Sequence, residues 1–311
     1  MPEKSIRVRA TATVANVSCG FDCIGYSIVN PSDVVTIMTK NKPGIEMIIS
    51  GPKADSIPTK AEQNTAGKAV ISYLNTINQN QGCIIKIEKG IPPGSGIGSS
   101  AASASAAVVG INELMGNPLP LEDLLIHGMA GEAVAAGVFH ADNIAPSLFG
   151  GMILIRSYDP LDILNLPIPE NLFSTAVLPD FTINTKDARK MLPEQVPLKS
   201  AIEQAGNLAG FILGLHEADF DLLGRSMVDL FAEPVRSKLI PGYHTVQQVA
   251  MDTGAIGCGI SGSGPALFSL SNSEEKARKI GIAMVKAFRE NGFDSIAYPS
   301  HIHRNPPEIL D

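Results

Sequence analysis

The strongest chemical signal in the sequence is a glycine-rich loop at residues 92–100. It reads Pro-Pro-Gly-Ser-Gly-Ile-Gly-Ser-Ser and lies between an apolar, strand-like run at 83–87 and an Ala-rich segment that ends at Gly110. Glycines let the backbone turn tightly and let a ligand approach it closely, and Ser99 or Ser100 is a natural N-cap for the helix that follows. Because the free N–H groups and positive end of a helix attract anions, we predict that this loop holds the phosphates of a nucleotide.

Two known phosphate-binding patterns do not fit this loop, and a tight strand–helix connection without a ligand is the alternative interpretation. The P-loop needs a lysine followed by Ser or Thr, whereas no Lys or Arg lies between Lys89 and Arg156. The dinucleotide-binding fingerprint needs a second strand and an acidic residue about 20 residues later, but the segment after this loop keeps a helical pattern.

A second glycine turn, Ser-Gly-Ser-Gly-Pro at 261–265, lies between two apolar, strand-like runs. A plain hairpin turn is its alternative interpretation, and a nucleophile elbow is excluded because no helix follows. Two such loops at strand ends indicate a cleft between two domains that holds a nucleotide.

Charged and amide side chains near these loops could recognise a second substrate. Asn16 and Asp22 flank a bend after the first strand; alone they are ordinary turn residues, but a carboxylate there suits an ammonium group or a hydroxyl. Arg189 and Arg236 lie in the second half of the chain, and the planar fork of arginine suits a carboxylate. Arginines at helix ends on the surface are the ordinary alternative.

The glycine loop, the 261–265 turn and the bend after the first strand together resemble the three motifs of the GHMP kinases, a family of small-molecule kinases. The resemblance implies ATP and Mg²⁺. It also implies a two-domain α+β fold, in which an N-terminal ATP-binding domain and a ferredoxin-like C-terminal domain enclose the active site.

Within this family the chain looks most like the branch that phosphorylates L-homoserine, and each role below is what that resemblance implies. The amino end of the substrate is expected at Asn16, Asp22 and His140, its carboxylate at Arg189 and Arg236, and further contacts at Thr185 and Gly262. ATP is expected at Asn64 and at Pro92, Pro93, Gly94, Ser95, Gly96, Ile97, Gly98, Ser99, Ser100, Ala101 and Ala102, with Mg²⁺ at Ser100 and Glu132.

Asn143 stands where other members of the family use an aspartate as catalytic base. Because an amide does not accept a proton at neutral pH, the resemblance implies catalysis by Asn143 and Arg189 through positioning and charge neutralisation, which suits a loose phosphoryl transition state. Whether Asn143 or the adjacent Asp142 faces the hydroxyl is left open.

Composition sets the limits of the function. The 311 residues suffice for two domains, and the net charge of −7 argues against nucleic acid or an anionic membrane as partner. The N-terminus carries no apolar leader, and the four scattered cysteines favour reduced thiols in the cytoplasm. The resemblance further implies a homodimer and a place in threonine biosynthesis.

Hydrophobic periodicity predicts strands mixed with helices in both halves of the chain. Residues 33–40 and 45–50 resemble a hairpin around an Asn-Lys-Pro-Gly turn. A proline-rich stretch places the domain boundary at residue 160, which gives domains 1–160 and 161–311. Whether the last strand, near 295–311, returns to the first domain is left open.

Three rival functions remain: a GHMP kinase for another alcohol such as mevalonate or a sugar, a catalytically silent nucleotide sensor of the same fold, and a structural or assembly protein. Retention of the proposed metal ligands Ser100 and Glu132 argues against the sensor.

Overall fold

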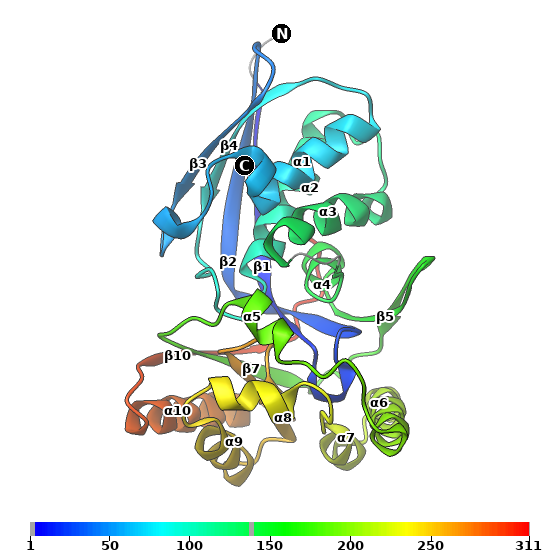
Figure 1. Cartoon of the computed structure of the whole chain (residues 1–311), viewed down its shortest axis with the longest axis vertical. Coiled ribbons are helices and arrows are strands. Elements are labelled where there is room, and N and C mark those ends of the chain that lie inside the picture. Colours follow the sequence, from blue (N-terminus) through cyan, green and yellow to red (C-terminus); the bar gives the residue numbers. More distant parts are fainter. Residues whose placement is uncertain (1–3, 137–139, 311) are drawn as a thin grey trace.

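The computed structural model describes residues 4–136 and 140–310. The chain builds two sheets, one above the other along the long axis of the molecule (Figure 1). Helices cover each sheet, so the predicted two-domain α+β fold is confirmed.

The first sheet has seven strands in the order β11-β1-β2-β4-β3, and β5 joins β2 to β6. Its strands are β1 (Ser5–Ala15), β2 (Ile24–Lys40), β3 (Ile45–Ser50), β4 (Gly82–Glu88), β5 (Met152–Tyr158), β6 (Leu161–Leu166) and β11 (Glu308–Leu310). Its helices are α1 (Thr65–Thr76), α2 (Ser99–Leu114), α3 (Leu125–Ala136) and α4 (Ile144–Phe149).

The predicted hairpin between 33–40 and 45–50 is wrong. β3 pairs in parallel with β4, and β4 lies between β3 and β2. The Asn-Lys-Pro-Gly turn does reverse the chain locally, but a parallel pair requires a long crossover. Here that crossover contains α1, and no local turn signal could have revealed it.

α2 is the central helix of the first half. It packs against β1, β2, α1 and α3, and nearly all of its Ala, Ser and Gly residues are buried. Small side chains let the helix approach the sheet closely: a Cβ atom on Gly110 would lie 3.2 Å from Ile37 Cδ1. This packing fixes the N-terminus of α2 at the end of β1, where the glycine loop arrives.

The second sheet is antiparallel, in the order β10-β7-β9-β8. Its strands are β7 (Phe173–Pro179), β8 (Gly257–Ile260), β9 (Leu267–Ser271) and β10 (Ser295–His301). The helices of this half are α5 (Thr185–Lys190), α6 (Leu198–Glu217), α7 (Phe220–Ser226), α8 (Glu233–Arg236), α9 (Tyr243–Asp252) and α10 (Glu274–Glu290). None of the helices within residues 4–136 and 140–310 has the length and apolar character that a bilayer crossing needs.

Strand pairing shows where the chain passes between the two sheets. β6 still pairs with β5, so the passage follows Leu166 and not residue 160. At the other end, β10 stays in the second sheet, whereas β11 returns to pair with β1. We therefore propose a domain boundary within 167–172, with a short C-terminal return to the first domain.

Buried contacts hold the two halves together. Tyr26 on β2 shares a 2.7 Å hydrogen bond with Ser174 on β7, and its ring meets Phe268 on β9 edge to face. Gln204 on α6 donates to the carbonyl of Cys19 at 2.9 Å. The bend that carries Asp22 is thus anchored to both halves.

Candidate active site

A cavity of about 380 Å³ lies between the two halves and receives residues from both. It has the size of a small-molecule site. The predicted site residues that line it are Asn16, Asp22, Asn64, Pro93, Gly94, Ser95, Gly96, Gly98, Ser99, Ser100, Glu132, His140, Asn143, Thr185, Arg189, Arg236 and Gly262.

The glycine loop turns its carbonyl groups away from the cavity. The carbonyls of Ser95, Gly96 and Ile97 accept hydrogen bonds from Ala266 N–H at 3.2 Å, Ser261 Oγ at 2.7 Å and Thr13 N–H at 3.1 Å, respectively. A loop whose carbonyls are occupied on one side presents its N–H groups to the other. The loop and the N-terminus of α2 therefore form an anion-binding surface.

Close packing explains why two positions of this loop are occupied by glycine. A Cβ atom on Gly96 would lie 2.7 Å from the carbonyl oxygen of Gly264, and one on Gly98 would lie 2.0 Å from Thr13 Oγ1. Both glycines also have φ in the left-handed region, at 81° and 69°. The three motifs therefore touch through backbone atoms, and the 261–265 turn supports the loop from behind.

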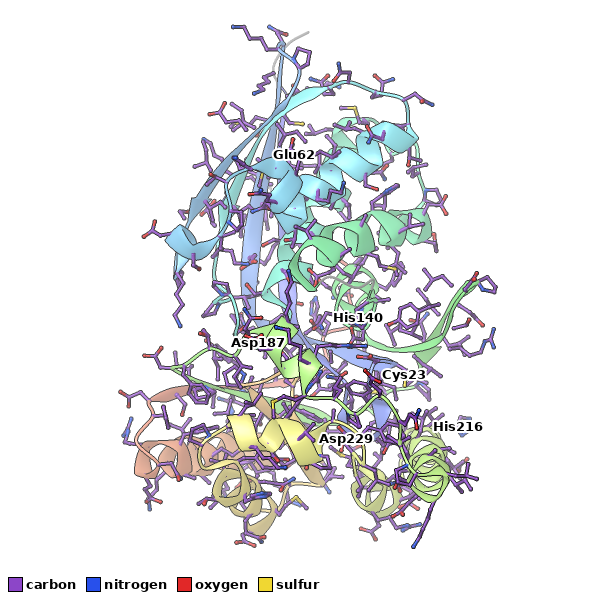
Figure 2. All side chains as sticks on the ribbon, in the orientation of Figure 1. Cys23, Glu62, His140, Asp187, His216 and Asp229 are labelled. Atoms are coloured by element: carbon purple, nitrogen blue, oxygen red, sulfur yellow. The ribbon has the colours of Figure 1, made fainter. Side chains whose placement is uncertain are left out.

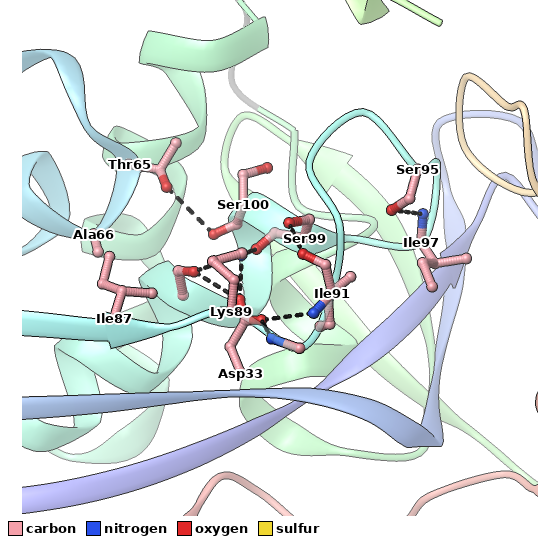
Figure 3. A network of polar contacts seen from close by, with 12 residues as sticks. Asp33, Thr65, Ala66, Ile87, Lys89, Ile91, Ser95, Ile97, Ser99 and Ser100 are labelled. Carbon is pink, nitrogen blue, oxygen red and sulfur yellow. Dashed lines mark hydrogen bonds and ion pairs between the residues drawn. The ribbon is translucent and has the colours of Figure 1, made fainter. Parts of the chain in front are cut away.

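Lys89 and Asp33 form a buried ion pair beneath the loop (Figure 3). Lys89 Nζ also donates to the carbonyl of Ser99 at 2.8 Å and to Ser103 Oγ at 3.0 Å. The second carboxylate oxygen of Asp33 accepts from the N–H groups of Gly90 and Ile91, each at 3.0 Å. This network joins the start of the loop to the first turn of α2.

Sequence reasoning missed this pair, although Lys89 is the last cation before the loop. Lys89 lines the cavity, but its three N–H groups are occupied. Burial lowers the pKa of Lys89, and the charge of Asp33 opposes that shift. Lys89 thus supports the loop from below, while the loop itself carries no lysine.

Glu132 on α3 faces the start of α2. Burial raises the pKa of Glu132 to about 7, against the opposing effects of a hydrogen bond from Ser100 and the charge of Lys89. Among the described residues, its buried Oε1 has no hydrogen-bond partner. An unpartnered carboxylate oxygen beside a serine hydroxyl fits a hard cation.

Asn143 and Asp142 both line the cavity at the start of α4. Asn143 Oδ1 accepts a 2.7 Å hydrogen bond from Thr13 Oγ1, so the amide nitrogen is the part available to a ligand. Burial, together with the negative charges of Asp22 and Glu132, raises the pKa of Asp142 to about 7.

Asp22, His140 and Arg189 form one polar cluster. Arg189 Nη1 lies 2.8 Å from Asp22 Oδ2 and donates to His140 Nε2 at 3.0 Å. Burial lowers the pKa of His140, so its ring is neutral near pH 7 and Nε2 accepts from Arg189. Figure 2 shows His140 between the two halves, at the level of α5.

Arg236 enters the cavity from the end of α8. Its Nη1 donates to the carbonyl of Gly262 at 2.9 Å, and the same carbonyl accepts from Asn16 Nδ2 at 2.7 Å. The guanidinium groups of Arg236 and Arg189 lie 5.2 and 5.9 Å from the centre of the Phe21 ring. Phe21, which sequence reasoning also missed, therefore places two cations in one wall of the cavity.

Several of the predicted site residues have structural roles. Asn64 caps α1 by accepting from the N–H groups of Ala66 and Gly67, and it donates to the carbonyl of Pro58. Asn16 Oδ1 accepts from the N–H of Asp22 at 2.9 Å, which shapes the bend. Pro92, Ile97, Ala101 and Ala102 do not line the cavity. Ile97, Ala101 and Ala102 are buried core residues that hold the loop and α2 in place.

Known proteins resemble this chain over nearly its whole length. Residues 64–151 match the family model "GHMP kinases N terminal domain", and residues 211–290 match "GHMP kinases C terminal". The homoserine kinase of Chlorobium phaeobacteroides is 43% identical over 99% of this chain and 100% of the relative. The homoserine kinase of Methanococcus vannielii is 41% identical over 87% of this chain and 89% of the relative.

Solved structures give the same relationship. The crystal structure of a homoserine kinase from Cytophaga hutchinsonii superposes with a TM-score of 0.95 at 47% identity and covers 98% of this chain and 97% of its own. A mevalonate kinase from L. major, solved with R-mevalonate, superposes with a TM-score of 0.72 at 17% identity over 95% of this chain and 96% of its own. The second likeness concerns the fold alone.

Proposed function

The chain belongs to the GHMP kinase family, and we propose that it is a homoserine kinase. It transfers the γ-phosphate of ATP to the side-chain hydroxyl of L-homoserine, giving O-phospho-L-homoserine and ADP. The observation that carries this proposal is the convergence of Asp22, Arg189 and Arg236 in one cavity with the glycine loop.

ATP binds with its phosphates on the loop. The occupied carbonyls of Ser95, Gly96 and Ile97 support this assignment, because they turn the opposite side of the loop to the cavity. The N–H groups of the first turn of α2 are open to phosphate oxygens, whereas the Ile97 N–H also donates to Ser95 Oγ at 3.5 Å. The adenine side is assigned to Asn64 and Pro58, which line the same cavity.

L-Homoserine binds beside the phosphates with both of its charged ends held. Its ammonium group suits Asp22, and its carboxylate suits Arg189 and Arg236, whose guanidinium groups share the Phe21 ring. His140 and Thr185 line the same wall, and Asn16 and Gly262 hold the bend and Arg236 in place. This wall recognises a zwitterion, which mevalonate and sugars are not.

Ser100 and Glu132 are the residues that would hold Mg²⁺. The unpartnered Oε1 of Glu132, counted among the described residues, supports that fit. When bound, Mg²⁺ would neutralise charge on the phosphates.

Asn143 orients the acceptor hydroxyl through its amide nitrogen, because Thr13 holds its carbonyl. A loose transition state needs little activation of the nucleophile, so the hydroxyl proton can leave late to the transferred phosphate. Asp142 lines the same cavity and, with a pKa of about 7, is a second group that can accept this proton.

The same resemblance supports a homodimer in the cytoplasm with a role in threonine biosynthesis.

The function is tested by ADP release with Mg-ATP and four acceptors: L-homoserine, L-serine, mevalonate and galactose. Release that depends on L-homoserine supports the proposal. Release with mevalonate or galactose alone assigns a different kinase, and nucleotide binding without any release assigns a silent sensor.

A further inference from the structure

The hydroxyl of Tyr158 bridges the two segments that hold the acceptor. Tyr158 is the last residue of β5, and its side chain is partly exposed. Its Oη donates to the carbonyl of Asp22 at 3.1 Å and accepts from the N–H of Ala141 at 3.2 Å. Both distances are within the hydrogen-bonding range.

These two peptide groups belong to different parts of the site. One belongs to Asp22, which is assigned to the ammonium group of the substrate. The other adjoins Asp142 and Asn143, which line the cavity and are assigned to the reacting hydroxyl of the substrate. Both peptide groups are therefore fixed to one atom of one side chain.

Strand pairing ties β5, the strand that carries Tyr158, to the segment after the bend. β5 pairs with β2 directly after the bend, with Ile24 opposite Leu154, and the N–H of Ile155 donates to the carbonyl of Cys23 at 2.7 Å. β5 is thus in register with the Asp22 segment before Tyr158 extends to Ala141.

We propose that Tyr158 is a positioning residue that sets the separation between Asp22 and Asn143, and thereby the length of the amino-alcohol that the enzyme accepts. Tyr158 does not line the cavity, so it acts through the two peptides that it joins. This inference depends on the proposed function, because it concerns how L-homoserine is distinguished from L-serine, whose hydroxyl is one methylene closer to the ammonium group.

Protonation of the phenol supports the bridge. Burial, together with the charges of Asp142 and Asp22, raises the pKa of Tyr158 well above its usual value. A phenol of ordinary pKa, about 10, is already protonated at neutral pH, and this shift acts in the same direction, so Tyr158 keeps the hydrogen that it donates to Asp22.

Tyr158→Phe tests the proposal, because it removes only the bridging oxygen. We expect the KM for L-homoserine to rise about tenfold, as for the loss of a hydrogen bond. The preference for L-homoserine over L-serine should fall, whereas the KM for ATP and the stabilisation by Mg-ATP should stay unchanged. Tyr298→Phe, which removes a phenol from β10 in the second sheet, is the matched control and should behave like wild type.

Three results would overturn the proposal: wild-type KM and preference in Tyr158→Phe, equal increases in both KM values, or a defect that appears in Tyr158→Leu and not in Tyr158→Phe. If Tyr158→Phe does not fold, hydrogen exchange of the wild-type protein decides. The Ala141 amide should then be protected, and exchange at the unprotected rate would contradict the bridge. A wild-type protein that does not phosphorylate L-homoserine would instead refute the proposed function.

Discussion

Arg189 and Asp22 form an ion pair across the cavity, with Nη1 2.8 Å from Oδ2, although they lie in opposite halves of the chain. An amino acid carries the same two charges at its own ends. Its carboxylate can therefore take the place of Asp22 at Arg189, while its ammonium group takes the place of Arg189 at Asp22. The ligand-free pair keeps both charges compensated until the substrate arrives.

Arg189→Leu should raise the KM for L-homoserine by roughly ten- to a hundredfold, since a charge-assisted hydrogen bond contributes about 1.5–3 kcal/mol. The KM for ATP should change little, because Arg189 lies on the acceptor wall. Lys190→Leu is the matched control on the same helix, since its side chain is 76% exposed and, within the described part of the chain, pairs only with Asp187. Steady-state kinetics with each substrate varied in turn gives the answer. Unaltered homoserine kinetics would remove Arg189 from the site.

Asn143→Asp should lower kcat by about tenfold or more while the protein stays folded, because it removes the amide donor that Thr13 orients. Thr13→Val should lower kcat in the same direction, since it releases that orientation. Asp142→Asn is the comparison that separates the two candidates for the reacting hydroxyl. Full activity in Asn143→Asp, with loss in Asp142→Asn, would transfer the role to Asp142.

Lys89→Met should destabilise the protein by about 3–5 kcal/mol, because it leaves Asp33 buried without a countercharge. The side chains of this pair are 3% and 0% exposed. Arg278→Met is the control, since it breaks the exposed Arg278–Glu274 pair, whose expected contribution is below about 1 kcal/mol. Urea denaturation measures the free energy of unfolding of both variants. Equal losses in the two variants would show that the pair does not support the loop.

Glu132 should make the ligand-free protein less stable as pH rises from about 4.5 to 7, against the histidines of lowered pKa (His127, His140 and His303), which act in the opposite direction. Burial raises the pKa of Glu132 from its ordinary value of 4.5 to about 7, so the unfolded chain releases this proton first and the folded state is penalised, by on the order of 3 kcal/mol. Asp142 acts in the same direction. Thermal melts of wild type and Glu132→Gln should show a smaller decrease in the variant. Stabilisation by Mg-ATP should be larger at pH 8 than at pH 6, and the reverse order would contradict a cation at Glu132.

Local signals in the sequence predicted the elements of the site but not all of its contacts. The glycine loop, the 261–265 turn and the helix after the loop were predictable because turns and caps are encoded within a few neighbouring residues. The β3–β4 pairing was not, since it depends on a crossover through α1. Lys89 and Asp33 escaped notice for a similar reason: 56 residues separate them in the sequence, and only the β2–β4 pairing brings them together.

The side-chain chemistry was partly predictable as well. Asp22, Arg189 and Arg236 do line one cavity, as the resemblance implied. The Asp22–Arg189 ion pair and the Phe21 ring beneath both arginines were not foreseen, because residue type alone does not tell which charges compensate one another without a ligand. Asn16 and Asn64 line the cavity too, but the hydrogen bonds that they make serve the bend and the α1 cap.

The most direct measurement of the central claim compares kcat/KM for L-homoserine with that for two truncated acceptors. 4-Hydroxybutyrate lacks the ammonium group, and 3-amino-1-propanol lacks the carboxylate. Recognition at both ends predicts that each analogue loses at least about tenfold in kcat/KM, as for a lost charge-assisted contact. It also predicts that Arg189→Leu lowers kcat/KM less for 3-amino-1-propanol, which has no carboxylate, than for L-homoserine. Either analogue reacting as well as L-homoserine would contradict a site that holds an amino acid by both of its charges.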